Sequence, residues 1–172
     1  ATELIGNWIT NCQGYEYPPP TGRSTISNLN INATEIDFQI DGYYGISCAG
    51  KITDAWKIKM SYDPSSLTKL NLPTTNSFLN DEASIKPGIS STNNYTNINT
   101  AMISMSQVVY DQDMANLYNT IAHCGFTDWV VGIEKDITGL PCMTGANKTG
   151  QKIYSIFSIT NHQLKMGEAD ST

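Results

Sequence analysis

Strict alternation of apolar and polar residues marks two segments of this sequence, at 34–40 and 56–62. Successive side chains of a β-strand point to opposite faces, so a period of two predicts strands with one buried face and one solvent-facing face. The turn sequence Asn32-Ala33 predicts a hairpin between 34–40 and a preceding strand at 26–31. The apolar positions of the alternating segments are Ile36, Phe38, Ile40, Trp56, Ile58, Met60 and Tyr62.

The segment Leu4–Cys12 (LIGNWITNC) contains a G-x-W motif formed by Gly6 and Trp8. It is short and half apolar, and we predict that it is the first strand of a closed β-barrel. A glycine in a strand allows the backbone to pass close to a neighbouring strand. The large Trp8 ring is expected to fill the floor of the barrel.

Further short apolar runs complete a mainly β fold. With about eight to ten strands in all, we predict a single antiparallel β-barrel in one domain, residues 1–172. Met102 and Met105 are expected on opposite faces of their strand, and Trp129, Val131 and Ile133 on one face of theirs. The additional strands are predicted near residues 44–48, 69–72, 85–89, 101–110, 128–134, 152–159 and 163–168.

One α-helix is predicted, near residues 111–124. Asp111 or Asp113 can accept hydrogen bonds from the free amides of its first turn, and Gly125 is expected as the residue that follows its end. The apolar stripe, with the spacing of a helix face, consists of Met114, Leu117, Tyr118, Ile121 and Ala122. The helix should pack against the barrel exterior or close one end of it.

Two loops are candidates for binding a partner or covering a ligand. Three prolines in 15–22 (YEYPPPTG) exclude a helix and predict an extended rim loop. Residues 65–100 include a long polar run, which predicts either a lid over a ligand site or, as the more common outcome, a simple surface loop.

The four cysteines, Cys12, Cys48, Cys124 and Cys142, are widely spaced and contain no C-x-x-C motif. We predict two disulfides, and among the three possible pairings we favour Cys12 with Cys48 and Cys124 with Cys142, because each would join a loop near a strand end. The alternative is four buried thiols. Disulfides and the low-charge, Asn- and Thr-rich composition favour an exported bacterial protein, either periplasmic, outer-membrane-associated or secreted.

Several functional classes are disfavoured. The ten Lys and Arg residues are scattered in a chain of net charge −6, which argues against binding nucleic acid, and the apolar runs are too short for a membrane span. No signal-peptide segment is recognised at Ala1, so we expect a cytosolic protein or a mature chain. His123 and Cys124 are adjacent in the predicted helix and cannot form a catalytic dyad, while Asp111-x-Asp113 lacks the rest of a calcium loop. We predict no enzyme activity, metal site or cofactor.

The G-x-W on the first strand, the series of alternating strands, the single helix and a closing hairpin (YSIFSI…QLKMG) together resemble the lipocalin and calycin superfamily, particularly its exported bacterial members. The predicted helix precedes the last three strands, whereas lipocalins place theirs nearer the end. No arginine follows the last strand to stack on Trp8.

The resemblance implies a non-enzymatic carrier for a small hydrophobic molecule or lipid, bound inside the barrel. The expected cavity wall consists of large apolar or amphipathic residues at alternating positions: Phe38, Trp56, Met60, Tyr62 and Phe157. Two alternatives remain. The same side chains can fill a small barrel that binds nothing, or the protein can be an exported interaction module or inhibitor that binds a protein partner through its rim loops.

Overall fold

The computed structural model describes residues 4–15, 22–67, 69–71, 94–142, 145–146, 149–152, 156–160 and 163–167. Within these residues the fold is mainly β, with one helix, α1 (Gln112–Thr120), and two 3-10 turns, η1 (Pro64–Ser66) and η2 (His123–Gly125). The strands are β1 (Gly6–Ile9), β2 (Gln13–Tyr15), β3 (Arg23–Ile31), β4 (Glu35–Tyr44), β5 (Ile52–Tyr62), β6 (Lys69–Asn71), β7 (Asn94–Asn97), β8 (Thr100–Val109), β9 (Glu134–Asp136), β10 (Pro141–Cys142), β11 (Gly145–Ala146), β12 (Ile156–Thr160) and β13 (Gln163–Gly167).

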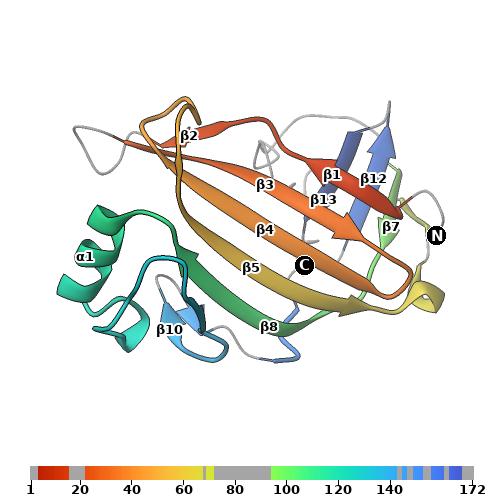
Figure 1. Cartoon of the computed structure of the whole chain (residues 1–172). Helices are drawn as coiled ribbons and strands as arrows, with labels where there is room; N and C mark the ends of the chain where they lie inside the picture. The colour runs from red at the N-terminus through yellow and green to blue at the C-terminus, as the bar shows by residue number, and fades with distance from the viewer. Residues whose placement is uncertain are drawn as a thin grey trace.

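The main sheet is antiparallel, with the strand order β1-β3-β4-β5-β8-β9 and β2 paired to β3. A second sheet has the order β13-β12-β7-β6, and β10 pairs with β11. Figure 1 shows β7, β12 and β13 at one end of the main sheet and α1 with β10 at the other. Among the described residues no ladder joins β9 to β1, so the main sheet is open and a closed barrel is not established.

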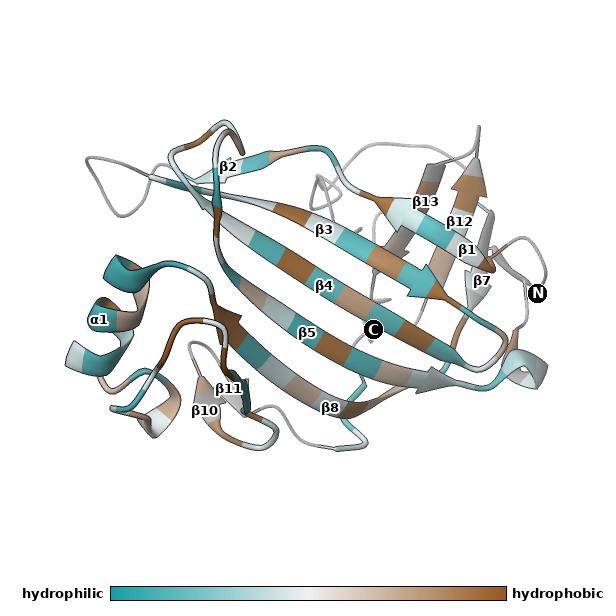
Figure 2. Cartoon of the chain, viewed as in Figure 1, coloured by the Kyte–Doolittle hydropathy of each residue, from teal (hydrophilic) through white to brown (hydrophobic). Residues whose placement is uncertain are grey.

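The alternating segments form the centre of the main sheet, as predicted. Ile36 lies opposite Met60, and Ile40 lies opposite Trp56, on neighbouring strands β4 and β5. The predicted hairpin between β3 and β4 is confirmed, and the Asn32 side chain accepts hydrogen bonds from two backbone amides in its turn. We call the apolar side of the sheet the inner face and the polar side the outer face; the alternation is visible along the strands in Figure 2.

Two groups of buried side chains cover opposite ends of the inner face. Trp8 packs against the first group and donates a hydrogen bond from Nε1 to the Leu4 carbonyl oxygen at 3.0 Å. The first core cluster is Leu4, Leu29, Ile31, Ile36, Phe38, Met60, Tyr62, Ile98, Phe157 and Met166. The second core cluster is Met102, Met105, Val109, Met114, Ala115, Tyr118, Cys124, Trp129, Ile137 and Cys142.

The glycine of the G-x-W motif has a different role from the one expected. A Cβ added to Gly6 would meet no atom within 4 Å, so no neighbouring strand approaches closely here. The φ of Gly6 is instead +150°, a value that other residues rarely adopt. Gly6 is therefore explained by its backbone conformation.

The prediction for Met102 and Met105 was wrong. Both side chains are buried in the second core cluster, on the same face of β8. The pairing with β5 shifts between Lys59 and Met60, which leaves Ile103 as an extra residue in β8. This β-bulge reverses the alternation of side chains beyond it, so both methionines point to the inner face.

The helix begins as predicted but ends earlier. The Asp111 side chain caps it by accepting a hydrogen bond from the Met114 amide at 3.1 Å. The helix ends at Thr120, and Ala122 takes the left-handed conformation that was expected of Gly125. Of the predicted stripe, Met114 and Tyr118 are buried, whereas Leu117, Ile121 and Ala122 are exposed. The early turn brings Cys124 to Cys142 in the second core cluster.

Two further predicted strands are absent. Residues 128–133 turn instead of extending, with Trp129 buried and Val131 and Ile133 exposed. The Asn119 side chain binds both the amide and the carbonyl of Trp129, so these groups cannot join a ladder. Residues 45–48 also form a turn after β4. The predicted strand at 85–89, most of the polar segment 65–100 and the proline run lie outside the described residues.

Both disulfides form with the favoured pairing, Cys12 to Cys48 and Cys124 to Cys142. The first joins the segment between β1 and β2 to the turn after β4. The second joins η2 to β10. Disulfides do not persist in a reducing cytosol, so these two crosslinks are compatible with an exported protein.

Candidate functional site

The residues expected to line a cavity are divided between the two clusters. Phe38, Met60, Tyr62 and Phe157 lie together in the first core cluster, each no more than 8% exposed. Trp56 is half-buried and packs against the second core cluster. The structure therefore brings four of the five together as tightly packed side chains, and their role as a ligand-binding wall stays a prediction.

Half-buried apolar side chains lie between the clusters, at the centre of the inner face. Ile40 packs against the first cluster, Trp56 against the second, and Ile58 against both. The ladder places Ile40 opposite Trp56, and Ile58 is two residues further along β5. We call these three residues the seam.

A buried carboxylate precedes the seam residues on β5. Asp54 is 1% exposed, and its inner-face position is two residues before Trp56. Its Oδ1 accepts hydrogen bonds from the Arg23 guanidinium and, at 2.9 Å, from the Thr53 hydroxyl. Gly42 lies opposite, and a Cβ there would collide with both the carboxylate and the guanidinium. A glycine at this position therefore leaves space for the buried ion pair.

The other oxygen of Asp54 connects the sheet to the helix. Asp54 Oδ2 accepts hydrogen bonds from the Tyr118 hydroxyl at 2.6 Å and from Gln107 Nε2 at 3.2 Å. The Gln107 side-chain oxygen lies 2.8 Å from His123 Nε2. Because this oxygen can only accept, His123 Nε2 must bear a proton. Arg23, Asp54, Gln107, Tyr118 and His123 thus form one hydrogen-bonded chain, which we call the polar network.

Aromatic rings hold the imidazole at the end of the polar network. The His123 ring stacks on Tyr118, with centroids 4.0 Å apart, and lies edge-on to Trp56 at 6.0 Å. Trp129 contacts His123 from another side at 5.7 Å. These contacts place His123 beside the seam and fix the plane of its ring.

Burial shifts the Tyr118 and His123 rings of the network toward their neutral forms. Burial raises the pKa of the Tyr118 hydroxyl, and the Asp54 charge raises it further. Burial lowers the pKa of His123, and Arg23 adds to this effect, whereas Asp54 opposes it. Burial alone would lower the pKa of Arg23, but Asp54 and Tyr118 outweigh it and raise the pKa. At neutral pH the network contains a neutral imidazole beside an Arg–Asp pair.

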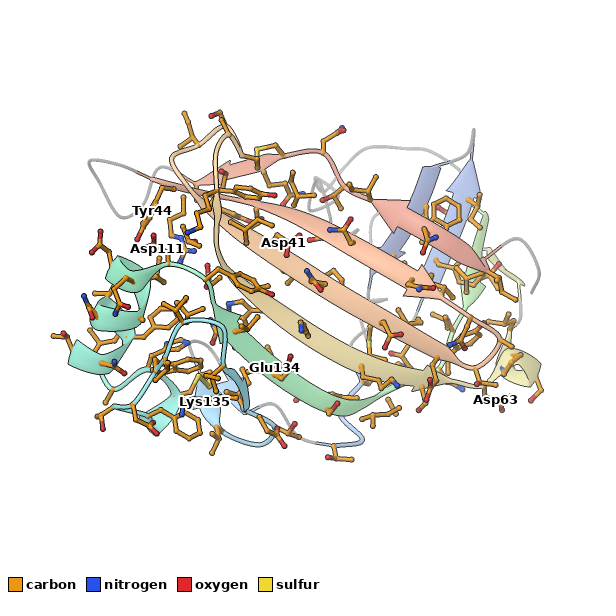
Figure 3. All side chains as sticks on the ribbon, viewed as in Figure 1. Asp41, Tyr44, Asp63, Asp111, Glu134 and Lys135 are labelled. Atoms are coloured by element: carbon orange, nitrogen blue, oxygen red, sulfur yellow. A yellow bond between two sulfur atoms is a disulfide. The ribbon has the colours of Figure 1, made fainter. Side chains whose placement is uncertain are left out.

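A shallow hollow of about 590 Å³ lies on the outer face of the main sheet. Its two lysines are in ion pairs: Lys57 lies 2.7 Å from Glu134, and Lys59 lies 3.4 Å from Glu35. Figure 3 labels Glu134 on this side of the molecule, near β8. The backbone or side chains of Trp8 and Phe38 also border the hollow. Its polar lining is Asn7, Asn28, Asn30, Asp37, Gln39, Lys57, Lys59, Ser104, Ser106 and Glu134.

The described residues contain no group of three or more His, Cys, Asp or Glu side chains placed to hold a metal ion. Both candidate members of the His123–Cys124 pair have other partners, since Cys124 is in a disulfide and His123 contacts Gln107. In the part of the chain that is described, no helix is long and apolar enough to cross a bilayer.

None of the sequence-based predictions included the polar network, although the strand patterns contain a signal for it. Asp54 and Gln107 each occupy an apolar position in an alternating strand, since Asp54 precedes Trp56 by two residues and Gln107 follows Met105 by two. A polar residue on the apolar face of a strand requires a hydrogen-bonding partner. The partners, Arg23 and Tyr118, come from distant segments and follow no local spacing. A scan of protein-family models and a search of curated proteins found no match to this chain.

Proposed function

We propose that this chain is a non-enzymatic binding protein that holds a small hydrophobic molecule or lipid against the seam, as a lipocalin-like carrier does. The observation that supports it is the exposure pattern of the inner face. Ile40, Trp56 and Ile58 are half-buried at the centre of the face, while Ile36 and Met60 near one end are fully buried.

The centre of an inner face is normally its best covered part, because core side chains are close-packed. Here the covering layers meet the sheet at its two ends, so large apolar side chains between them keep contact with solvent. A bound apolar molecule would remove this surface from water, which contributes roughly 25 cal/mol per Å². The seam thus offers a driving force for a hydrophobic ligand without requiring a charged partner.

We further propose that the two sheets are parts of one barrel and that the protein is exported from a bacterium. Continuity between the sheets supports the barrel, because β7 leads into β8 through Ile98, which is fully buried in the first core cluster. The two disulfides support export. Non-reducing peptide mapping of protein isolated from its source tests the export proposal, and four free thiols would contradict it.

Quenching of tryptophan fluorescence by a brominated fatty acid tests the site. Quenching by bromine decreases steeply with distance from the bound chain, so it should come mostly from Trp56. Trp56→Phe should therefore remove most of the quenching, whereas Trp129→Phe, which changes a ring that is 2% exposed, is the matched control and should retain it. Equal loss in the two variants would place the ligand elsewhere.

Native mass spectrometry of the protein from its own source tests the function independently. Co-purification of a lipid or small apolar molecule, displaced by a neutral fluorescent probe such as N-phenylnaphthylamine, is the expected result. Failure of this probe and of a panel of fatty acids and alcohols to bind would contradict the carrier function.

A protein-interaction module is the second candidate, and a specific apolar patch supports it. Five large apolar residues near α1 are more than a third exposed: Leu117, Ile121, Val130, Val131 and Ile133. Exposed apolar patches on soluble proteins often mark interaction sites. Ile121→Asp with Val130→Asp should abolish recovery of a defined partner from the source while leaving probe binding at the seam unchanged. If the double variant recovers the same partner, the patch is not its binding surface.

A further inference from the structure

We propose that His123 is the polar anchor of the seam site and that the ligand is an apolar molecule with a terminal hydroxyl group, which donates a hydrogen bond to His123 Nδ1. This inference rests on the proposed carrier function and assigns the ligand's chemical class. It follows from the fixed tautomer of one imidazole and from its position beside the seam.

The tautomer of His123 is set by the buried network behind it. Gln107 is fully buried, its Nε2 donates to Asp54 and to the Tyr118 hydroxyl, and its oxygen is the acceptor for His123 Nε2. Reversal of the Gln107 amide would break the two donated bonds. The proton of a neutral His123 is therefore held on Nε2, and Nδ1 presents a lone pair.

Nδ1 has no hydrogen-bond partner among the described residues, although the other polar groups of the network are bonded to one another. His123 is half-buried, so part of the residue remains in contact with solvent. Its ring contacts Trp56, which packs on the second core cluster beside Ile58. An apolar molecule lying on the seam could thus bring one polar end to Nδ1.

The charges near the imidazole favour an uncharged donor. Asp54 already accepts bonds from Arg23, Thr53, Tyr118 and Gln107, so it offers no oxygen to a ligand ammonium. Such a cation would also lose its water close to Arg23. An anionic head group would face the Nδ1 lone pair. A hydroxyl group donates one hydrogen bond without a charge to desolvate.

The titratable neighbours of His123 define the pH dependence. Asp54 on β5, Arg23 on β3 and Tyr118 on α1 are the groups that influence it, and Trp129 and Trp56 contribute uncharged rings. At about pH 8 the imidazole is neutral and accepts from a hydroxyl; as the pH falls through the lowered pKa of His123, the ring becomes protonated and donates from Nδ1. The preferred head group should then change from a hydroxyl to an anion.

The test compares dodecanol, dodecanesulfonate and dodecylamine as competitors of N-phenylnaphthylamine. The sulfonate stays ionised at both pH values, so any change in its relative affinity reports on the protein. Near pH 8, His123→Phe should lower the ratio of dodecanol to sulfonate affinity about five- to tenfold, the effect of one hydrogen bond. The ratio should also fall in the wild-type protein at the lower pH at which His123 becomes protonated. His162→Phe is the matched control and should change neither ratio.

Nuclear magnetic resonance on the unmodified protein avoids any folding defect in the variant. The chain has two histidines. On addition of dodecanol, the ¹⁵N resonance of His123 Nδ1 should shift toward that of a hydrogen-bonded nitrogen, with His162 as the internal reference. Binding of dodecanol without this shift, or equal binding of all three head groups, would overturn the inference but leave the carrier function intact. Failure of every dodecyl compound to displace the probe would overturn both.

Discussion

The two core clusters cover opposite ends of the same sheet face and are stabilised differently. The first is almost entirely apolar, and Tyr62, its residue with a polar tip, donates a hydrogen bond to the Asn32 carbonyl oxygen at 2.6 Å. The second contains a disulfide and adjoins a buried network centred on Asp54. Apolar packing tolerates changes that conserve volume, whereas a buried ion pair depends on each partner.

The two ends of the sheet also differ in the side chains that they hold in place. The hairpin β12–β13 brings Phe157 and Met166, which lie opposite each other in the ladder, onto the first cluster. At the other end, the network orients His123 beside Trp56. Figure 3 shows a further polar contact at this end, where the Tyr44 hydroxyl donates to Asp111 at the start of α1. The polar end is therefore the one suited to recognise a specific chemical group.

Asp54→Ala is expected to have the largest effect on stability. The substitution would remove the carboxylate that pairs with the half-buried Arg23 guanidinium. It would also remove the oxygen that accepts hydrogen bonds from Tyr118 and Gln107. We expect a loss of about 3–5 kcal/mol in the free energy of unfolding, measured by urea denaturation. Asp54→Asn conserves volume but should also be strongly destabilising. Asp37→Ala, on the exposed outer face, is the control, and an equal loss there would contradict the assignment.

Met60→Ala tests the first cluster in the same assay. Met60 is fully buried, and its truncation should cost about 3 kcal/mol through lost packing and a residual cavity. Met60→Leu, in contrast to Asp54→Asn, should cost less than about 1.5 kcal/mol because it conserves volume. Lys59→Ala, one residue earlier on the outer face, should change stability little. A severe loss in Met60→Leu would mean that the two clusters do not differ as described.

Removal of the second disulfide should affect the two ends unequally. Cys124→Ala with Cys142→Ala opens a loop with a sequence separation of 18 residues, for which we expect a loss of about 2–3 kcal/mol. Hydrogen exchange should accelerate in α1 and η2 but not in β3 and β4. The matched control is Cys12→Ala with Cys48→Ala, which should leave α1 protected. Uniform acceleration along the chain would show that the two ends unfold as one unit.

The first cluster was largely predictable from the sequence, because patterns within short segments determine which of its side chains face inward. The alternation in 34–40 and 56–62 fixes which side chains face inward, and the turn at Asn32 fixes the register of the hairpin. Phe38, Met60 and Tyr62 were identified from this pattern alone and are buried together. Their proposed contact with a ligand is a separate question, which the pattern does not answer.

The second cluster was less predictable, because its structure depends on contacts between distant residues. The bulge at Ile103 reverses the alternation within β8, and Ala122 ends the helix through a conformation that only glycine usually adopts. Trp129 is fixed by the side chain of Asn119 rather than by a strand ladder. The partners of Asp54 come from β3, β8 and α1, and no periodic pattern relates them.

The smallest expected difference between the two ends of the sheet is in how their stability depends on pH. Burial lowers the pKa of His123 below its ordinary value of 6.5, whereas the unfolded chain retains that value. Below pH 6.5 the unfolded state therefore binds more protons, so the stability contributed by neutral His123 is present above this pH and is lost as the pH falls through the folded pKa.

Urea denaturation at a series of pH values from about 8 to 5 measures this loss. His123→Phe should make stability less dependent on pH over the upper part of this range, while His162→Phe should keep the wild-type slope. The first cluster has no titratable group that ionises in this range, so Met60→Ala should shift the whole curve without changing its slope. A slope that persists in His123→Phe would assign the acid sensitivity to carboxylates, and would remove the basis for treating the polar end as the pH-dependent one.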